Sequence, residues 1–465
     1  MSMHQSPRVN LTSFISVLAI IAGIILAAYP PSLFSQEESM AAALAVITIG
    51  FWATGVIAQH LTALLFFLLA MLFAVSPADV IFSGFGSTAL WLIFGGLVLG
   101  VAITSTGLGK IVARRVADRL DRSYVRIIAG VVSMGVLFAF LMPSAMGRVI
   151  LLVPIIEELT AHFGFKKGSN GRTGVFLAAI LGSFVPAFAI LPANVPNMVL
   201  VGLSETLFFT SPLYGEYLLL HFPILGILRA AVIVGLILWL YPDRPRWARH
   251  EELTPISPLS KDARLLSLVL LILLALWMTD FIHHVSPAWV ALAGAVFLLM
   301  PKIGLVNKKQ FNEKINYGSL FFVAGILGLG AMVSDSGLGD TLANGLIDLL
   351  PFGEGSPFWD YMSLSLASLL TGVATTAPGV PAVITPLCDN LSQVTNLPLK
   401  TVLMTQVLGF STVIFPYQAP PIAIGMQLAE ESLSAAFKVC VVLAIITVLF
   451  LFPLDYVWWN VLGWM

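Results

Sequence analysis

Long apolar runs recur from one end of this 465-residue chain to the other. Examples are 13–28, 218–241 and 265–278. A helix needs about 20 apolar residues to cross a bilayer, and inside lipid its backbone groups must be satisfied within the helix itself. With 58% hydrophobic and 10% charged residues, the chain is predicted to be an all-α polytopic membrane protein without a large extramembranous domain.

On this length scale we expect about eleven transmembrane helices and two broken apolar segments. The crossings are expected near 12–29, 40–58, 60–76, 87–106, 173–204, 216–241, 264–282, 286–301, 316–336, 401–428 and 437–460. The broken segments cover roughly 124–160 and 357–393, and MPSAMGR (142–148) and TTAPGVP (375–381) interrupt them. We interpret each as a re-entrant helical hairpin. The first run lacks a small-residue cleavage site before Tyr29, so it is expected to remain as a span.

Part of the chain occurs twice. Residues 89–120 align without a gap with residues 319–350, and eleven of the 32 positions are identical, including a Gly-Leu-Gly in each copy. Duplicated units in a multi-span chain are typical of secondary transporters, whose substrate site lies where the two copies meet. After each Gly-Leu-Gly the apolar spacing is that of an amphipathic helix lying along the membrane surface.

The basic residues indicate the orientation, because Lys and Arg concentrate in cytoplasmic loops. Twenty of the 23 fall on one side of the predicted topology, Lys400 falls on the other, and Arg148 and Arg229 lie at membrane depth. Basic residues flank the first hairpin, whereas acidic residues flank the second, so the first enters from the cytoplasm and the second from outside. The two copies are therefore predicted to be inverted, with the amino terminus cytoplasmic and the carboxyl terminus outside.

Two further spans are interrupted near their centres, by LPANVPN (191–197) and by FPYQAPP (415–421). Prolines there remove helical donors and free carbonyls, which is tolerated at membrane depth only where the backbone is buried in protein or faces a watery cavity. Four interrupted elements, two in each half, can converge on one central site.

A basic interfacial helix, a cytoplasmic hairpin, a broken span with a Pro-Asn turn and an inverted repeat of these parts together resemble the divalent anion sodium symporter family. That family belongs to a wider ion transporter superfamily. The resemblance covers the chain from about Met40 onward and implies a homodimer with a moving unit that works like an elevator. It also implies that the hairpin tips and broken spans bind sodium and a carboxylate substrate.

The family's Ser-Asn-Thr tips are degenerate in this sequence. They read Ser144-Ala145-Met146 and Thr376-Ala377-Pro378, so the asparagine is absent from both. Sodium prefers hard oxygen ligands, and neither methionine nor proline offers a side-chain oxygen. Coupling to Na⁺ or to H⁺ is therefore left open, no bound metal is assigned, and no other cofactor is expected.

Arg148 is the departure from the family pattern that bears most directly on the substrate. A guanidinium near the bilayer centre is costly unless it is paired or solvated. We hypothesise that Arg148 binds an anionic substrate in place of one sodium ion, with backbone N–H groups of the following half-helix as further donors. The alternative is that Arg148 pairs with Glu157, Glu158 or another carboxylate, or that the tip is shallower and its side chain extends to the membrane surface. Arg229 is expected to make a structural pairing or to face a cavity.

The remaining candidates are the small and polar residues at the four breaks, which line a site or cap a half-helix. With Arg148, the predicted substrate-binding residues are Ser144, Ala145, Asn194, Asn197, Thr375, Thr376 and Gln418. The predicted regions are 1–77 (first scaffold spans), 78–241 (repeat one), 242–263 (cytoplasmic linker), 264–301 (further scaffold spans) and 302–465 (repeat two).

These features predict a symporter or exchanger that moves a small anion, such as a dicarboxylate, a monocarboxylate or a sulfate-like ion, by alternating access. The expected surroundings are the lipid bilayer of a cell (inner) membrane, and a nucleic-acid partner is not expected. The alternative is a cation/proton antiporter or an arsenite-permease-like ion transporter, but none of the four breaks has a deep carboxylate. An enzyme is not expected, because paired intramembrane aspartates and a His-Glu-x-x-His motif are absent from the sequence.

Overall fold

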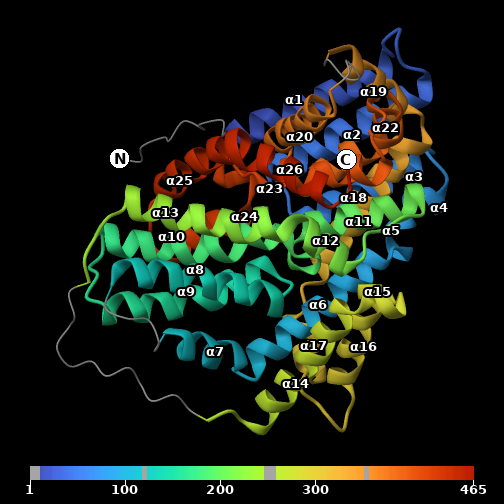
Figure 1. Cartoon of the computed structure of the whole chain (residues 1–465). Helices are drawn as coiled ribbons and strands as arrows, with labels where there is room; N and C mark the ends of the chain where they lie inside the picture. Colours follow the sequence, from blue (N-terminus) through green and yellow to red (C-terminus); the bar gives the residue numbers. More distant parts are fainter. Residues whose placement is uncertain (1–10, 118–122, 246–257, 350–355) are drawn as a thin grey trace, which may run out of the picture.

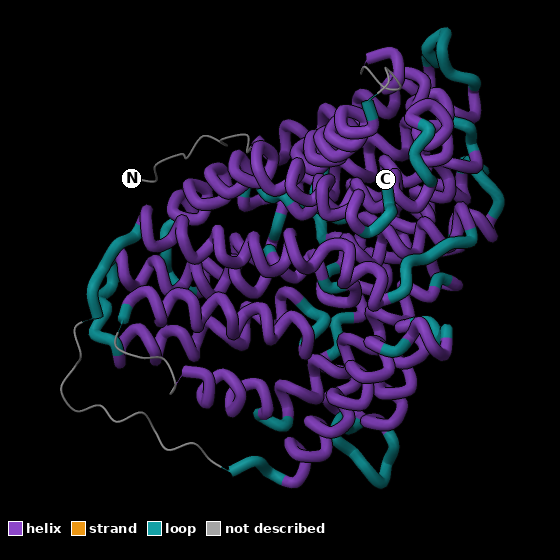
Figure 2. The backbone as a smooth tube through the Cα atoms, in the orientation of Figure 1, coloured by secondary structure: helices purple, strands orange, loops and turns teal. Residues whose placement is uncertain are grey.

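The computed structural model of the chain describes residues 11–117, 123–245, 258–349 and 356–465. All regular structure within these ranges is helical (Figures 1 and 2). The fold class is therefore confirmed as all-α. The first ten residues, most of the predicted linker 242–263 and the end of the basic interfacial helix lie outside the described residues.

Helices occupy the position of every predicted crossing. They are α1 (Leu11–Ala28), α2 (Gln36–Thr54), α3 (Gln59–Leu72), α6 (Thr88–Ser105), α10 (Asn170–Phe184) with α11 (Val195–Phe208), α12 (Tyr214–His221) with α13 (Arg229–Leu240), α14 (Lys261–Met278), α16 (Pro287–Leu299), α18 (Tyr317–Asp335), α23 (Leu399–Ser411) with α24 (Pro420–Leu428), and α25 (Leu433–Ile446) with α26 (Phe452–Val461). Six described stretches are long and apolar enough to cross a membrane. One of the six is the hairpin arm Tyr124–Leu141, and the other predicted crossings are shorter, broken or, like α2 and α14, less apolar or more charged.

Both re-entrant segments are helical pairs with a short non-helical tip. The first consists of α8 (Tyr124–Leu141) and α9 (Ala145–His162), which follow the surface helix α7 (Leu108–Ala117). The second consists of α20 (Pro357–Ala374), which is bent by 118° against the segment 379–395. That segment holds α21 (Gly379–Ile384) and α22 (Cys388–Thr395), and the surface helix α19 (Leu338–Leu349) precedes the pair. The hairpins are thus the same construction in each half.

The first broken span opens earlier than its sequence predicts. Its interruption was expected over 191–197, but α10 already ends at Phe184, and two short 3₁₀ turns fill the gap to α11. Pro186 explains the difference, because proline has no N–H to continue the helical ladder. The second broken span is open between Ser411 and Pro420, around a 3₁₀ turn at Pro416–Gln418.

The two halves use the same packing contacts. In the first half α8 packs along α10, and in the second half α20 packs along α23. Glycine allows both approaches: a Cβ at Gly135 would lie 2.5 Å from the backbone nitrogen of Ser183, and one at Gly409 would collide with Ser368. Small residues let membrane helices approach closely where no hydrophobic force draws them together. Each hairpin is therefore held against the first half of its broken span.

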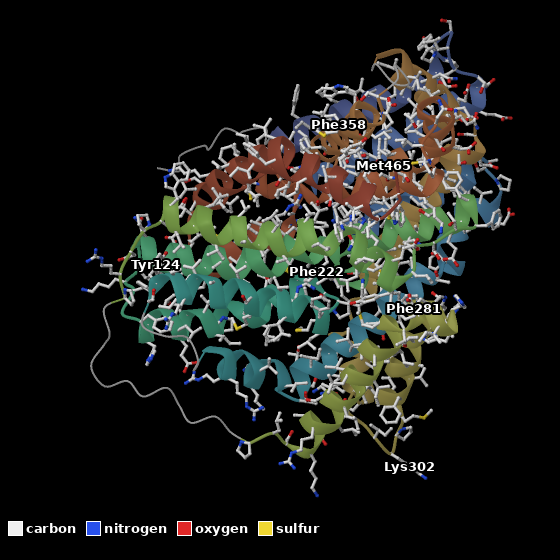
Figure 3. All side chains as sticks on the ribbon, in the orientation of Figure 1. Tyr124, Phe222, Phe281, Lys302, Phe358 and Met465 are labelled. Atoms are coloured by element: carbon white, nitrogen blue, oxygen red, sulfur yellow. The ribbon has the colours of Figure 1, made fainter. Side chains whose placement is uncertain are left out.

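Two apolar cores follow from this packing. The larger surrounds the hairpins and broken spans, and a smaller one joins α2, α3 and α18. Phe222, labelled in Figure 3, is partly buried, packs against the larger core and meets Phe140 of α8 edge to face, with ring centroids 5.2 Å apart. Phe222 also begins a π-helical segment, Phe222–Leu228, that joins α12 to α13, and a second one, Thr447–Leu451, joins α25 to α26.

Candidate functional site

The first hairpin tip is a capped half-helix. Ser144 is the N-cap of α9, and its Oγ accepts a hydrogen bond of 3.1 Å from the backbone N–H of Gly147. Ala145 is the first helical residue and is partly buried. The remaining N–H groups of the first turn have no partner one turn back and carry the positive end of the helix dipole. The tip can therefore bind an anion through its backbone.

Arg148 lies one turn into α9 and is completely buried. Its guanidinium donates four hydrogen bonds to the protein, to Ser183 O (3.0 Å), Met142 O (2.5 Å), Ala193 O (3.0 Å) and Asn194 Oδ1 (3.1 Å). The predicted partners Glu157 and Glu158 are not among them. Since a guanidinium has five N–H donors, one remains. Arg148 thus joins the end of α8 to the first broken span.

Both predicted asparagines lie at the first break and are buried. Asn194 accepts from Arg148, and its Nδ2 donates to the carbonyl of Phe184 at 3.3 Å. Asn197 donates to the carbonyls of Phe188 and Ile190 at 3.1 and 3.0 Å, which leaves its Oδ1 without a hydrogen-bond partner. The amide groups therefore replace helical donors that the two 3₁₀ turns leave out.

The second half arranges its candidates differently. Thr375 Oγ1 donates to the carbonyl of Thr371 at 2.7 Å, while Thr376 is 9% exposed at the tip. Gln418 Oε1 accepts two backbone hydrogen bonds across the second break, from Ile414 at 2.9 Å and from Phe415 at 2.8 Å. A glutamine in this half thus braces the break, as Arg148 and Asn194 do in the other.

Contacts between the halves bring the four breaks together. The second arm of the first hairpin, α9, packs against α24, and α21 of the second hairpin packs against α11. At the first of these contacts a Cβ on Gly425 would lie 2.8 Å from Val149. Within the second half, Gln418 Nε2 lies 3.6 Å from the Cβ position of Gly372 on α20. Each hairpin therefore touches a broken span of both repeats.

Ion pairs tie the predicted cytoplasmic ends of these elements. Arg172, 3% exposed at the start of α10, pairs with Glu157 of α9 at 2.7 Å and with the buried Glu431 beyond α24. Lys167 pairs with the exposed Glu430 at 2.6 Å, and this hydrogen bond and charge hold the pKa of Glu430 below its usual value. The first hairpin and the second broken span are thus joined at one end.

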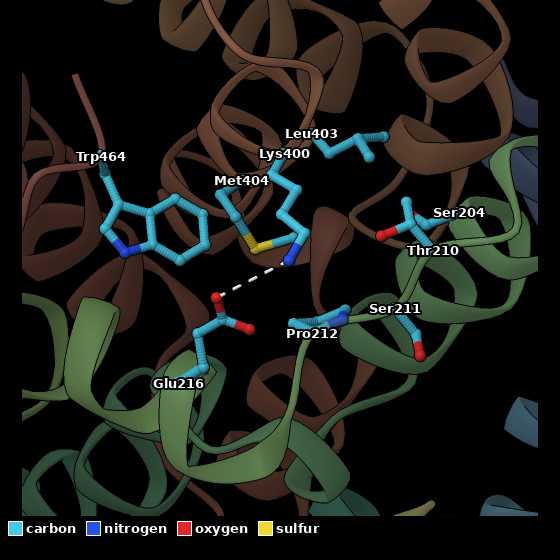
Figure 4. A pocket seen from close by; sticks show the side chains of 9 residues that line it. All are labelled: Ser204, Thr210, Ser211, Pro212, Glu216, Lys400, Leu403, Met404 and Trp464. Atoms are coloured by element: carbon cyan, nitrogen blue, oxygen red, sulfur yellow. Dashed lines mark ion pairs between the residues drawn. The ribbon is translucent and has the colours of Figure 1, made fainter. Parts of the chain in front are cut away.

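Two hollows lie between helices of the described residues, and only the second borders a break. The first, of about 230 Å³, is lined by 210–212, Glu216, Lys400 and Trp464 among others, and Lys400 Nζ lies 3.9 Å from Glu216 Oε1 (Figure 4). The second, of about 220 Å³, lies between Val185, Arg229 and residues 411–413. Neither is lined by any of the eight predicted substrate-binding residues, whose hydrogen bonds are made largely within the protein.

The structure brings forward two buried charges that the sequence reasoning did not assign to a site. Arg229 donates to Ser411 O at 3.2 Å and to Ser411 Oγ at 2.8 Å, at the second break. Asp455, completely buried in α26, accepts a hydrogen bond of 3.3 Å from Tyr361. In the sequence, Asp455 is an acidic residue inside the last apolar span, outside the four breaks where a carboxylate was considered.

Comparison with known proteins shows which family the chain matches. The family model described as sodium:sulfate symporter transmembrane region matches residues 8–465. A membrane protein of Cupriavidus necator is 26% identical over 403 residues, covering 82% of this chain and 76% of that protein. The L-tartrate/succinate antiporter of Escherichia coli K12 is 22% identical over 373 residues, covering 73% and 72%.

The same fold occurs in a solved structure. The YdaH transporter of Alcanivorax borkumensis matches with a TM-score of 0.58 at 15% identity, and the alignment covers 98% of both chains. Together with the family match, this confirms the resemblance drawn from the repeats and the breaks. The chain belongs to the sodium:sulfate symporter family, within the divalent anion symporters, and is a multi-pass secondary transporter of anions rather than an enzyme.

Proposed function

We propose that this chain transports a C4-dicarboxylate, of the kind that succinate and tartrate represent, by alternating access. The observation that carries the proposal is the joining of each hairpin to broken spans of both repeats, in a chain whose relatives include L-tartrate/succinate antiporters. The half-helix start at the first tip offers backbone donors and the second tip offers the Thr376 hydroxyl, while a dicarboxylate has two anionic ends. A cation/proton antiporter or arsenite-permease-like activity is not favoured, because no carboxylate lies at the four breaks.

The proposed binding groups are those at the tips and breaks whose hydrogen-bonding capacity is not fully used within the protein. They are the backbone N–H groups at Ala145 and after it and the hydroxyl of Thr376. Asn197 donates both of its amide hydrogens to the protein, so its Oδ1 can only accept, from a substrate hydroxyl such as those of tartrate. Ser144, Asn194, Thr375 and Gln418 hold the tips and the breaks in shape through the hydrogen bonds described above. We infer that Arg148 both holds the break in shape, through four hydrogen bonds to the protein, and binds the anion, through its remaining N–H.

The coupling ion and the assembly are also proposals. The family's description implies sodium, yet Met146 and Pro378 replace tip positions that would offer side-chain oxygens. We therefore propose that sodium alone does not stabilise this protein. The resemblance further implies a homodimer in the cell inner membrane, in which the hairpins and broken spans move against scaffold helices near 40–76 and 264–301.

The test is a thermal-shift screen of purified protein against succinate, tartrate, sulfate and acetate, with and without sodium, followed by counterflow in proteoliposomes. A ligand at 100 times its Kd raises the free energy of unfolding by about 2.7 kcal/mol. We expect succinate or tartrate to stabilise the protein and to exchange with saturation. Stabilisation by sulfate alone, or by sodium alone, would contradict the proposed substrate or the proposed coupling, respectively.

A point variant sharpens this test. Thr376→Val removes one hydroxyl at the tip and keeps the side-chain shape, so we expect the Kd for the dicarboxylate to rise about tenfold, as the loss of one charge-assisted hydrogen bond implies. Thr371→Val, on α20 before the tip, is the matched control, because that hydroxyl bonds to the carbonyl of Ala367 in its own helix at 2.9 Å. Equal affinities of the two variants would remove Thr376 from the site.

A further inference from the structure

A cluster of buried polar groups lies beside the second break and outside the proposed substrate site. Its members come from three helical elements that pack together: α12 with its continuation through the π-helical segment into α13, α20, and α26. They are Tyr217, His221, Arg229, Tyr361, Asp455 and Trp459, and none is more than 1% exposed. Aromatic rings fill the space between them: His221 lies 4.6 Å from the Tyr217 ring and 5.7 Å from the Trp459 ring.

Unsatisfied polar atoms concentrate in this cluster. Both ring nitrogens of His221, Nε of Arg229 and Oδ1 of Asp455 are buried without a hydrogen-bond partner. Buried polar groups in native proteins are almost always paired, so a group of unpaired ones needs an explanation. Proton binding provides one, because aspartate and histidine change their donor and acceptor capacity when they titrate.

The surroundings of Asp455 fit its protonated form. Its carboxyl group interacts with two uncharged donors, Tyr361 at 3.3 Å and Trp459, and no ion pair joins it to another residue in the described part of the chain. An ionised carboxylate at this depth would be costly without a close partner. The nearest cation is Arg229, which interacts with Asp455 electrostatically but is bonded elsewhere.

Arg229 connects Asp455 to the transport machinery. Its Nη1 holds the carbonyl and the hydroxyl of Ser411, and its Nη2 lies 3.4 Å from Thr412 Oγ1, where α23 ends and the second break opens. A small hollow beside it, which Cys440 also lines, borders Ser411 and Thr412 as well. On the same helical element Tyr217 donates to Phe188 O at 2.8 Å, inside the first break.

We propose that Asp455 is the proton-binding site through which this transporter couples anion movement to protons, and that Arg229 transmits its charge to the second break. With a proton on Asp455, Arg229 stays on Ser411 and the break keeps its present shape. When the proton leaves to water, the negative charge attracts the guanidinium away from Ser411, and the break rearranges. The groups that act on Asp455 are Arg229, Tyr361 and Trp459, and the other titratable members of the cluster, Tyr217 and His221, lie on the helical element of Arg229. This proposal rests on the proposed anion transport.

The experiment uses the full chain in sodium-free proteoliposomes with the membrane potential clamped. Uptake of whichever of radiolabelled succinate, tartrate or sulfate the wild type exchanges is measured at a fixed outside pH, while the inside pH is varied so that substrate ionisation outside stays constant. Counterflow at equal pH on both sides is measured in parallel. We expect an inward proton gradient to raise wild-type uptake at least threefold. Asp455→Asn should keep counterflow within about threefold and lose the stimulation.

The control is Asp389→Asn, the same change at an exposed carboxylate at the end of the second hairpin, which should keep the stimulation. A second variant guards against misfolding of the first. Tyr361→Phe removes the donor that favours the ionised form, so the pH midpoint of stimulation should rise by about one unit. Stimulation that persists in Asp455→Asn, or an unshifted midpoint in Tyr361→Phe if Asp455→Asn does not fold, overturns the proposal.

Failure of the two proposals can be told apart. A wild type that exchanges none of the three anions refutes the proposed transport function. A wild type that exchanges one of them but shows no response to the proton gradient refutes the proton site alone, and the cluster is then a structural one that buried water satisfies.

Discussion

At the residue scale, Arg148 shows how one buried charge organises a membrane site. Its position predicted a substrate contact, whereas its environment adds a structural role, because four acceptors of three different segments surround it. Three of these acceptors are carbonyl groups freed where helices end or break. The break leaves these carbonyl groups without helical donors. The guanidinium supplies the donors, and its hydrogen bonds hold the break in its open form.

Arg148→Lys separates these roles. A lysine ammonium cannot reach all four acceptors with the fork geometry of arginine, so buried carbonyls lose their donors. We expect the free energy of unfolding to fall by about 3 kcal/mol even without an anion. Thermal unfolding of purified protein measures this. If the variant melts like the wild type without an anion and differs only when one is added, Arg148 is a substrate ligand with no structural share.

At the element scale, the hairpins depend on close helix contacts that glycine permits. Gly409 of α23 faces Ser368 of α20, and a side chain there would collide with that helix. The same geometry recurs at Gly135 between α8 and α10. Because these contacts position both tips, their loss would disturb the site without any change to a binding group.

Gly409→Val should therefore lower stability by about 3 kcal/mol through overpacking and reduce transport in proportion to the misplaced tip. Gly235→Val on α13 is the control, because a Cβ there meets no atom within 4 Å. The yield of monodisperse protein and its melting temperature give the readout. Equal effects of the two substitutions would mean that helix propensity, rather than the α20–α23 contact, is responsible.

The ion pairs at the ends of α9, α10 and α24 also join the first hairpin to the second broken span. Arg172→Gln leaves the buried Glu431 without its cation, and we expect a loss of about 3 kcal/mol, because a buried charge is then unpaired. Lys167→Gln breaks only the pair with the exposed Glu430 and should leave the melting temperature nearly unchanged. A fall of similar size in both variants would contradict the assignment of Arg172 as the connecting residue.

At the scale of the whole molecule, orientation follows from the distribution of basic residues and is open to a direct test. The two native cysteines are buried, so introduced cysteines can be labelled with little background. In intact cells a membrane-impermeant maleimide should label Ser211→Cys, in an exposed loop on the predicted outer side. It should label Lys302→Cys only after the membrane is permeabilised. The opposite pattern would reverse the predicted topology.

The sequence by itself determined the fold class, the helix positions, the hairpins and the family, because all of these depend on local properties. Apolar length specifies a crossing, and a proline without an N–H specifies a break. The predicted start of one break was wrong, since Pro186 opens the first broken span before the segment 191–197 from which the break was inferred.

Only the tertiary structure decided what each polar residue contacts. The acceptors of Arg148 lie 6 to 46 positions away in the chain, and Arg229 reaches Ser411 across 182 positions. In the sequence Asp455 is an isolated charge in an apolar run, whereas in the structure the packing of α20 against α26 places Tyr361 beside it. Such pairings depend on which helix faces pack together, and helices of similar apolar sequence can pack in many alternative ways. The spacing of residues therefore predicted where the chain breaks, and packing alone determined which charges meet there.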